Sequence, residues 1–134
     1  MPSETILVVD DDAAVREYCC FVLAQEGYRV LPAAGGLEAL AICGRGERID
    51  MALVDVMMPD MNGIELAKRL VALDSGLKVA LTSGYSPDEV SRLIGEDGSS
   101  YRIFWKPYDR RIFLQMIRNV LDTPQRETVA CARS

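Results

Sequence analysis

Short apolar runs alternate with segments of helical periodicity five times along this chain, and the connections between them are short. The expected strands are Thr5–Val9, Tyr28–Pro32, Ala52–Asp55, Leu77–Leu81 and Tyr101–Trp105. Parallel strands need a crossover connection, usually a helix, so this alternation indicates right-handed βαβ units. The sequence therefore predicts an α/β fold, with a doubly wound parallel sheet between two layers of helices.

Local signals set the bounds of the expected helices. These run from Asp12 to Gly27, from Gly36 to Arg45, from Ile64 to Leu73, from Ser86 onward and from Asp109 to Asp122. Asp12 is suited to cap the first helix, and Gly27 is suited to end it. Helical spacing predicts buried stripes at Leu37, Leu40 and Ala41, at Leu66, Leu70 and Leu73, and at Phe113, Met116, Ile117, Val120 and Leu121.

The helix that begins at Ser86 differs from the others. Pro87 suits its first helical position. Its apolar residues are only Val90, Leu93 and Ile94, so we expect a helix that is weakly held against the sheet.

The composition is that of one globular domain. The chain has 134 residues, and 49% of them are hydrophobic. We expect the domain to cover residues 1–122, followed by a mobile tail or linker over 123–134, where the periodicity ends.

No apolar stretch reaches the roughly 18 residues of a membrane span, and no signal peptide is recognisable, so we expect a cytoplasmic protein without membrane insertion. The net charge of −5 argues against direct binding of nucleic acid.

Histidine is absent from the chain. A zinc site is therefore not expected, and the chain can neither carry a phosphohistidine nor use an imidazole as a base. Cys19, Cys20 and Cys43 lack a metal-binding spacing, and we interpret them as reduced packing residues.

Acidic, hydroxyl and ammonium side chains lie at the predicted carboxyl ends of the strands, where doubly wound sheets bind ligands. These residues are Asp10, Asp11, Asp55, Thr82 and Lys106. Clustered carboxylates repel one another unless a cation lies among them, and carboxylates with waters and a phosphate suit Mg²⁺ better than Ca²⁺. The set could stabilise a transferring phosphoryl group, with Asp55 as a carboxylate nucleophile.

Each of these signals is weak when taken alone. Asp12 suits a helix cap better than a metal ligand. A strand-end threonine such as Thr82 is usually a turn residue, and a lysine before proline, such as Lys106, is usually a solvated charge. Four strand ends with complementary chemistry nevertheless favour a shared site over coincidence.

Four motifs resemble the receiver domain of two-component response regulators. They are Val8-Val9-Asp10-Asp11-Asp12, Val54-Asp55-Val56-Met57-Met58-Pro59-Asp60-Met61-Asn62-Gly63, Leu81-Thr82-Ser83 and Trp105-Lys106-Pro107. The resemblance covers roughly Thr5 to Leu121. It implies a flavodoxin-like (βα)5 fold whose five-stranded sheet has the order 2-1-3-4-5.

The resemblance also implies a phosphorelay function. Asp55 would accept a phosphoryl group from the phosphohistidine of a sensor histidine kinase or a histidine phosphotransfer protein. The residues that would hold Mg²⁺ are Asp10, Asp11, Asp55 and, through its backbone carbonyl, Met57. Thr82 and Lys106 would bind the phosphoryl oxygens. Such a domain is a phosphoacceptor rather than an enzyme, limited to autocatalytic phosphoryl transfer and slow autodephosphorylation.

The chain departs from the family pattern in two places. The family usually has a switch aromatic three positions before the lysine, where this chain has Ile103, so signalling through Ile103 or Tyr101 is our hypothesis. Many relatives have a polar residue two positions after the acceptor, where this chain has Met57, and Gly84 lies two positions after Thr82. These positions flank the path of a hydrolytic water. We expect Met57 to prolong the life of the aspartyl phosphate, or simply to pack over the rim of the site.

We expect phosphorylation to rearrange the helix from Ser86 to Glu96, because weakly packed elements move most easily. The face that this helix forms with the fifth strand and the last helix would bind a downstream protein. No output domain is recognisable after Leu121, so a stand-alone receiver and a segment of a longer protein, such as a hybrid kinase, both stay open.

Two other classes stand as alternatives. A flavodoxin-like ligand-binding module would need a phosphate loop after the first strand, where Asp10, Asp11 and Asp12 would repel phosphate without a metal. A Mg²⁺-dependent aspartyl phosphatase generally has a second acid two residues after its nucleophile, where this chain has Met57.

Overall fold

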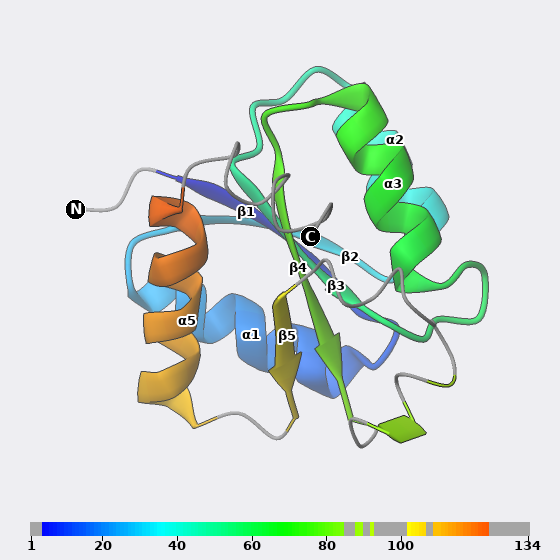
Figure 1. Cartoon of the computed structure of the whole chain (residues 1–134). Coiled ribbons are helices and arrows are strands. Elements are labelled where there is room, and N and C mark those ends of the chain that lie inside the picture. The colour runs from blue at the N-terminus through cyan, green and yellow to red at the C-terminus, as the bar shows by residue number, and fades with distance from the viewer. Residues whose placement is uncertain (1–3, 85–87, 90–91, 93–101, 107–108, 124–134) are drawn as a thin grey trace.

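The computed structural model describes residues 4–84, 88–89, 92, 102–106 and 109–123. Its strands form one five-stranded parallel sheet in the order β2-β1-β3-β4-β5 (Figure 1). They are β1 (Thr5–Val9), β2 (Arg29–Ala33), β3 (Met51–Asp55), β4 (Lys78–Ser83) and β5 (Arg102–Trp105). This architecture confirms the predicted fold and strand order.

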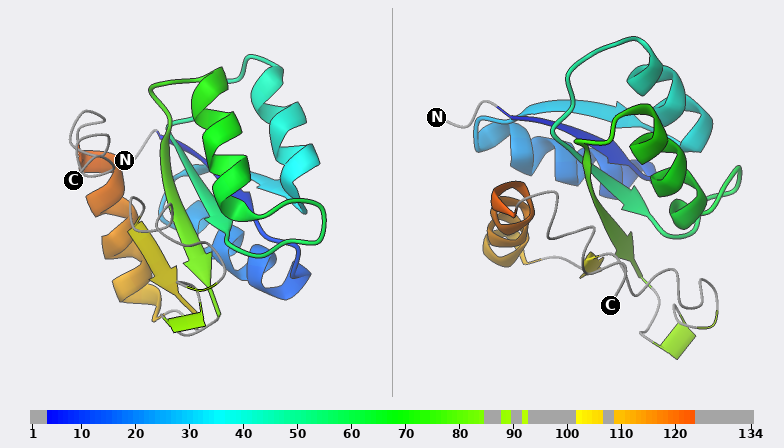
Figure 2. Two further views of the ribbon diagram at one scale, coloured as in Figure 1. Left: turned by 45° about the vertical axis from the view of Figure 1, so that its right-hand side comes forward. Right: turned by 45° about the horizontal axis from the view of Figure 1, so that its top comes forward.

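The helices cover both faces of the sheet. They are α1 (Ala13–Gln25), α2 (Gly36–Gly44), α3 (Gly63–Leu73) and α5 (Arg110–Asp122). α1 and α5 pack on one face and α2 and α3 on the other (Figure 2). Of the helix expected from Ser86, only Asp88, Glu89 and Arg92 are described, and these three residues are helical. Tyr101 and nearly all of the expected tail lie outside the described residues. None of the described helices has the length and hydropathy needed to cross a membrane.

Alternate residues of each inner strand enter the two cores. In β1, Ile6 and Val8 pack with the side chains of α1 and α5, whereas Leu7 and Val9 pack with those of α2 and α3. All five residues of β1 and of β3 are buried. Burial on both faces explains why these strands are continuous apolar runs in the sequence.

The first helix begins and ends where the sequence predicts. The carboxylate of Asp12 accepts hydrogen bonds from the backbone N–H groups of Ala14 (3.0 Å) and Val15 (3.4 Å). Gly27 follows the helix with a φ of 104°, a left-handed conformation that suits glycine. Asp12 is therefore a helix cap, as expected.

Two predicted buried stripes are wrong in part. Leu37 is 64% exposed, Ala41 is exposed and Leu40 is only partly buried. The buried face of α2 instead includes Ala39 and Ile42, which lie three residues apart. The exposed residues Leu37 and Ala41 therefore do not mark the face of α2 that packs on the sheet. Leu73 is 57% exposed because it is the last residue of α3, whose buried face ends at Leu70.

The cysteines have the expected structural role. Cys19, Cys20 and Cys43 are free. Cys19 is buried between α1 and the sheet, and this burial raises the pKa of its thiol to about 12. At neutral pH it is a protonated packing residue.

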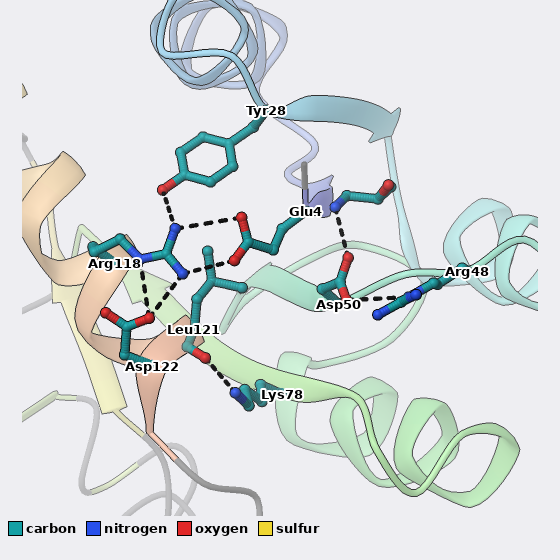
Figure 3. A network of polar contacts seen from close by, with 9 residues as sticks. Glu4, Tyr28, Arg48, Asp50, Lys78, Arg118, Leu121 and Asp122 are labelled. Atoms are coloured by element: carbon teal, nitrogen blue, oxygen red, sulfur yellow. Dashed lines mark hydrogen bonds and ion pairs between the residues drawn. The ribbon is translucent and has the colours of Figure 1, made fainter. Parts of the chain in front are cut away.

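Arg118 of α5 joins elements at the edge of the sheet where the strands begin (Figure 3). Its Nη2 lies 2.6 Å from Oε2 of Glu4 and 2.8 Å from Oδ1 of Asp122, and its Nη1 lies 3.3 Å from the hydroxyl of Tyr28. The hydrogen bond from Arg118 lowers the pKa of Glu4. This network ties the last turn of α5 to the starts of β1 and β2, at the edge opposite to the acidic residues considered next.

Candidate functional site

The carboxyl ends of β1 and β3 bring three acidic side chains together. Asp10 directly follows β1, and Asp55 is the last residue of the neighbouring β3. One carboxylate oxygen from each of Asp10, Asp11 and Asp55 lies within 4.8 Å of the other two. Asp10 and Asp55 are buried, whereas Asp11 is exposed. The cluster therefore reaches from the interior to the surface.

Lys106 brings an ammonium group to the two buried carboxylates. It follows β5, and its backbone N–H donates to the carbonyl of Ser83 at the end of β4 (2.8 Å). Its Nζ lies 2.9 Å from Oδ2 of Asp10 and 3.2 Å from Oδ2 of Asp55. Because one ammonium faces two carboxylates, this group carries an excess negative charge, which is unfavourable away from water.

Local hydrogen bonds hold the other oxygens of these two acids. The N–H of Asp12 donates to Oδ1 of Asp10 (2.9 Å), and the N–H of Met57 donates to Oδ1 of Asp55 (3.3 Å). Nη1 of Arg16 donates to the backbone carbonyl of Asp10 (2.7 Å). These bonds fix the orientation of both carboxylates.

Thr82 has a buried hydroxyl beside the end of β3. It pairs with Asp55 in the register of β3 and β4, and its carbonyl accepts the N–H of Val56 (2.9 Å). The residue is 2% exposed, and its Oγ1 has no hydrogen-bond partner among the described residues. Buried hydroxyls are normally paired, so this group is available to a ligand at the site.

Gly63 lets the chain fold back beneath Asp55. Its N–H donates to the carbonyl of Val56 (2.7 Å). A Cβ at this position would lie 2.4 Å from the carbonyl oxygen of Asp55, which is closer than packed atoms can come. The glycine is required here by the close approach of the two backbone segments, so a side chain would displace the end of β3.

The surroundings shift the pKa values of both partners. Burial raises the pKa of Asp55 to about 6, Lys106 opposes this shift, and Asp10 adds to it. At Lys106, burial acts to lower the pKa, but Asp10 and Asp55 outweigh it, so the pKa of the ammonium is raised. At neutral pH Asp55 is mostly ionised in surroundings that disfavour its charge.

The acidic cluster fits a hard divalent cation. Oxygens from Asp10, Asp11 and Asp55 lie close enough to share an ion, and carboxylate oxygen is the ligand that Mg²⁺ prefers. A cation would also offset the excess negative charge of the cluster. The chain has no histidine, the ligand that many transition-metal sites use. The three acids could therefore hold a metal, as the sequence predicts.

Three other predicted residues surround the site. Met57 is partly buried against the apolar cluster of α2 and α3, and so is Ile103, which pairs with Leu81 in the sheet. Gly84 is exposed, and a Cβ there would lie 3.8 Å from Cδ of Lys106. Met57 and Gly84 thus lie near Asp55 and Lys106, and Ile103 lies in the strand next to that of Thr82. The modulating role of Met57 and Gly84 and the switch role of Ile103 stay predictions.

One contact at this edge was missed in the sequence. The two carboxylate oxygens of Asp60 accept hydrogen bonds from the N–H groups of Gly36 (3.2 Å) and Leu37 (3.0 Å), in the first turn of α2. A weak signal was present: Gly35 is the N-cap of α2 and has no side chain to act as a cap. Such a helix needs an acceptor from elsewhere.

Fold and site together define a class of protein: an α/β domain with an acidic, metal-competent site at the carboxyl edge of its sheet. The chain belongs to the family described as "Response regulator receiver domain", whose model matches residues 6–128. The resemblance predicted from the four motifs is confirmed, and so is phosphorelay signalling as the function. The ligand-binding and phosphatase alternatives are not favoured.

Individual relatives agree with this assignment. The chain is 37% identical to sporulation initiation phosphotransferase F of Bacillus subtilis (strain 168) over 109 residues, 81% of this chain and 86% of that protein. It matches the crystal structure of a CheY-like response regulator receiver domain protein from Methanospirillum hungatei JF-1 with a TM-score of 0.78 at 35% identity, covering 90% and 95% of the two chains. It matches the response regulator protein TrrA from Thermotoga maritima, crystallised in complex with Mg²⁺-BeF, with a TM-score of 0.70 at 26% identity, covering 87% and 98%. Several other curated relatives are longer, and the chain spans about half of their length.

The raised pKa of Asp55 predicts that Asp55→Asn stabilises the chain at neutral pH in the absence of divalent cations. The folded state binds a proton at Asp55 more tightly than the unfolded state does, so wild-type stability falls as pH rises from about 4 through about 6. The variant escapes this loss. We expect its free energy of unfolding to exceed that of the wild type by about 1–3 kcal/mol at pH 7, and the gap to close below pH 4.

Urea unfolding in EDTA across this pH range measures the difference. Asp122→Asn is the matched control, because Arg118 lowers the pKa of Asp122 and its effect must therefore have the opposite sign. That variant should be less stable than the wild type at pH 7. A destabilising effect of Asp55→Asn at pH 7 would contradict the description of the site.

Proposed function

We propose that Asp55 is the phosphoacceptor of this receiver domain and takes its phosphoryl group from the phosphohistidine of a sensor histidine kinase or a histidine phosphotransfer protein. The observation that carries the proposal is the meeting of three chemically complementary groups from adjacent strands. Asp55 offers a carboxylate that is mostly ionised at neutral pH, and Lys106 offers an ammonium. Thr82 offers a buried hydroxyl that has no partner among the described residues. Because these 134 residues include no histidine, the phosphohistidine must lie outside them.

The transfer is a displacement at phosphorus. An oxygen of Asp55 forms a bond to phosphorus while the bond from phosphorus to the imidazole nitrogen breaks, and the nitrogen keeps the electron pair. We propose that Mg²⁺ is held by Asp10, Asp11, Asp55 and the backbone carbonyl of Met57. The ion would neutralise charge on the phosphoryl oxygens. The Mg²⁺-BeF complex of the related TrrA supports this choice of ion.

Two side chains of the protein would bind the transferred group. The hydroxyl of Thr82 can donate to one phosphoryl oxygen without giving up a hydrogen bond among the described residues. The ammonium of Lys106, already 3.2 Å from Asp55, can bind another oxygen in exchange for part of its present pairing. Both contacts exist only when Asp55 carries the phosphoryl group, so they can drive a change of conformation.

We place the output on the face that includes β5 and α5. Trp105 of β5 is 40% exposed and Ile112 of α5 is 55% exposed, which suits contact with a downstream protein. We propose that the helix expected from Ser86 to Glu96, most of which lies outside the described residues, completes this face. Leu81 precedes Thr82 in β4 and pairs with Ile103 in β5. Movement of Thr82 toward the phosphoryl group would therefore change the packing of Ile103 through Leu81.

Methyl NMR of Ile103 tests this route. We expect its chemical shift to change on phosphorylation, because its packing neighbours move with Thr82. A methyl signal of Ile103 that stays in place, while residues of the site itself shift, would remove Ile103 from the proposal.

Intact mass spectrometry tests the acceptor itself. With Mg²⁺ and acetyl phosphate, the wild-type chain should gain the mass of one phosphoryl group, and EDTA should prevent the gain. Asp55→Asn should gain nothing, whereas Asp50→Asn, an acid before the start of β3 at the opposite edge, should be modified like the wild type. Modification that survives in Asp55→Asn would refute the acceptor assignment.

We further propose that Met57 and Gly84 set how long the phosphoryl group remains on Asp55. Met57 is partly buried beside the acceptor and offers no polar group to orient an attacking water. Met57→Asn supplies such a group, and we expect it to speed dephosphorylation several-fold. The measurement is the loss of phosphorylated chain by intact mass after removal of acetyl phosphate, with Met58→Leu as a packing control, and an unchanged rate would show that Met57 only packs.

A further inference from the structure

The loop from Val56 to Asn62 carries Met57, and its two ends are held by hydrogen bonds. At its start, the N–H of Met57 donates to Oδ1 of Asp55 (3.3 Å). At its end, Gly63 donates to the carbonyl of Val56 (2.7 Å), and the side chain of Asn62 caps α3 by accepting the N–H of Glu65 (2.9 Å). These bonds close the base of the loop beside the acceptor.

The outer part of the same loop is held by Asp60. Oδ1 of Asp60 accepts the N–H of Gly36 and Oδ2 accepts the N–H of Leu37, which are 24 and 23 residues away in the sequence. Gly35 occupies the N-cap position of α2 and provides no side-chain hydrogen bond, so Asp60 caps this helix from another part of the chain. Hydrogen bonds from Leu37 and Gly36 lower the pKa of Asp60, so the carboxylate stays charged and favours the positive end of the helix.

The two glycines at the start of α2 leave space for this contact. A Cβ at Gly35 would lie 3.1 Å from both carboxylate oxygens of Asp60. A Cβ at Gly36 would lie 2.9 Å from Sδ and 3.1 Å from Cγ of Met61. Asp60 and Met61 therefore rest directly on the helix, and the helix cannot move without moving the loop.

We propose that Asp60 is a positioning residue for phosphoryl transfer. By holding the loop on α2, it sets the position of the Met57 backbone beside Asp55, and so the affinity for Mg²⁺ and the rate of phosphorylation, without touching the ion or the phosphoryl group. This inference rests on the proposed function. A metal ligand that is displaced by about 1 Å loses much of its contribution to binding and catalysis. A loop held only at its base would allow such a displacement of the Met57 carbonyl.

Mg²⁺ affinity of the full chain tests the inference. Trp105 is the single tryptophan and immediately precedes Lys106, so its fluorescence reports titration of the site with Mg²⁺. We expect Asp60→Ala to weaken Mg²⁺ binding about tenfold, the lower range for partners that orient a metal site. Phosphorylation by acetyl phosphate should slow in proportion at low Mg²⁺ and recover at high Mg²⁺.

Glu38→Ala is the matched control. Glu38 lies in the first turn of the same helix, and its Oε1 accepts the N–H of Ala34 (2.8 Å), so its removal deletes one charge and one bond at the start of α2 without detaching the loop. We expect this variant to bind Mg²⁺ like the wild type. Equal losses in Glu38→Ala and Asp60→Ala would overturn the inference, because the effect would then come from charge or from α2 alone.

Two further variants separate geometry from charge. Asp60→Asn retains one acceptor oxygen but has an NH2 group in place of the other, so it can accept only one of the two N–H groups of α2 and should recover part of the affinity. Asp60→Glu retains the charge but moves the carboxylate by one methylene, so it should bind Mg²⁺ more weakly than the wild type. An Asp60→Glu chain with wild-type affinity contradicts the inference, and this comparison decides the matter even if Asp60→Ala does not fold.

The outcome is independent of the phosphoacceptor assignment. If the wild type gains no phosphoryl group, the proposed function fails, but the Mg²⁺ titrations still decide whether Asp60 positions the loop. Hydrogen exchange of the Gly36 and Leu37 amides provides a second readout. It should be faster in Asp60→Ala and unchanged in Glu38→Ala, and slow exchange in Asp60→Ala would show that Asp60 does not hold this helix.

Discussion

Two buried carboxylates share one ammonium at the carboxyl edge of the sheet. The rest of the structure depends on the excess negative charge that this leaves. Lys106 pairs with Asp10 and Asp55 at once, and the remaining negative charge raises the energy of the unliganded site. Two additions would therefore lower the energy of the site: a cation among the carboxylates, and a group whose oxygens can accept hydrogen bonds from Lys106. A charge conflict of this kind makes the domain responsive to a ligand, at a cost in the stability of the resting fold.

The fold confines this excess negative charge to one edge of the sheet. The order β2-β1-β3-β4-β5 places the ends of β1 and β3 side by side, and β4 and β5 then bring Thr82 and Lys106 to the same edge. Gly63 and the cap supplied by Asp60 hold the following loop close to Asp55. At the other edge, the network around Arg118 fastens α5 to the start of the sheet. One edge is thus available for chemistry and the other contributes to stability.

Features governed by local interactions could be predicted from the sequence. The strands follow from continuous apolar runs, the cap at Asp12 from an acid just before a helix, and the site from polar residues at strand ends. Features that depend on tertiary contacts could not. The buried face of α2 consists of residues such as Ala39 and Ile42 that pack on the sheet and α3, and a partner of Asp60 lies 24 residues away in the sequence. No local pattern encodes that distance.

Chemical trapping tests directly whether Asp55 itself carries the phosphoryl group. Borohydride reduces an acyl phosphate to an alcohol, so reduction of the phosphorylated chain converts the modified aspartate to homoserine, which peptide mass spectrometry can locate. If Asp55 is the acceptor, homoserine forms at position 55 after treatment with Mg²⁺ and acetyl phosphate, and none forms when the phosphodonor is omitted. Homoserine at position 10 or 11, or at any position other than 55, would contradict this assignment.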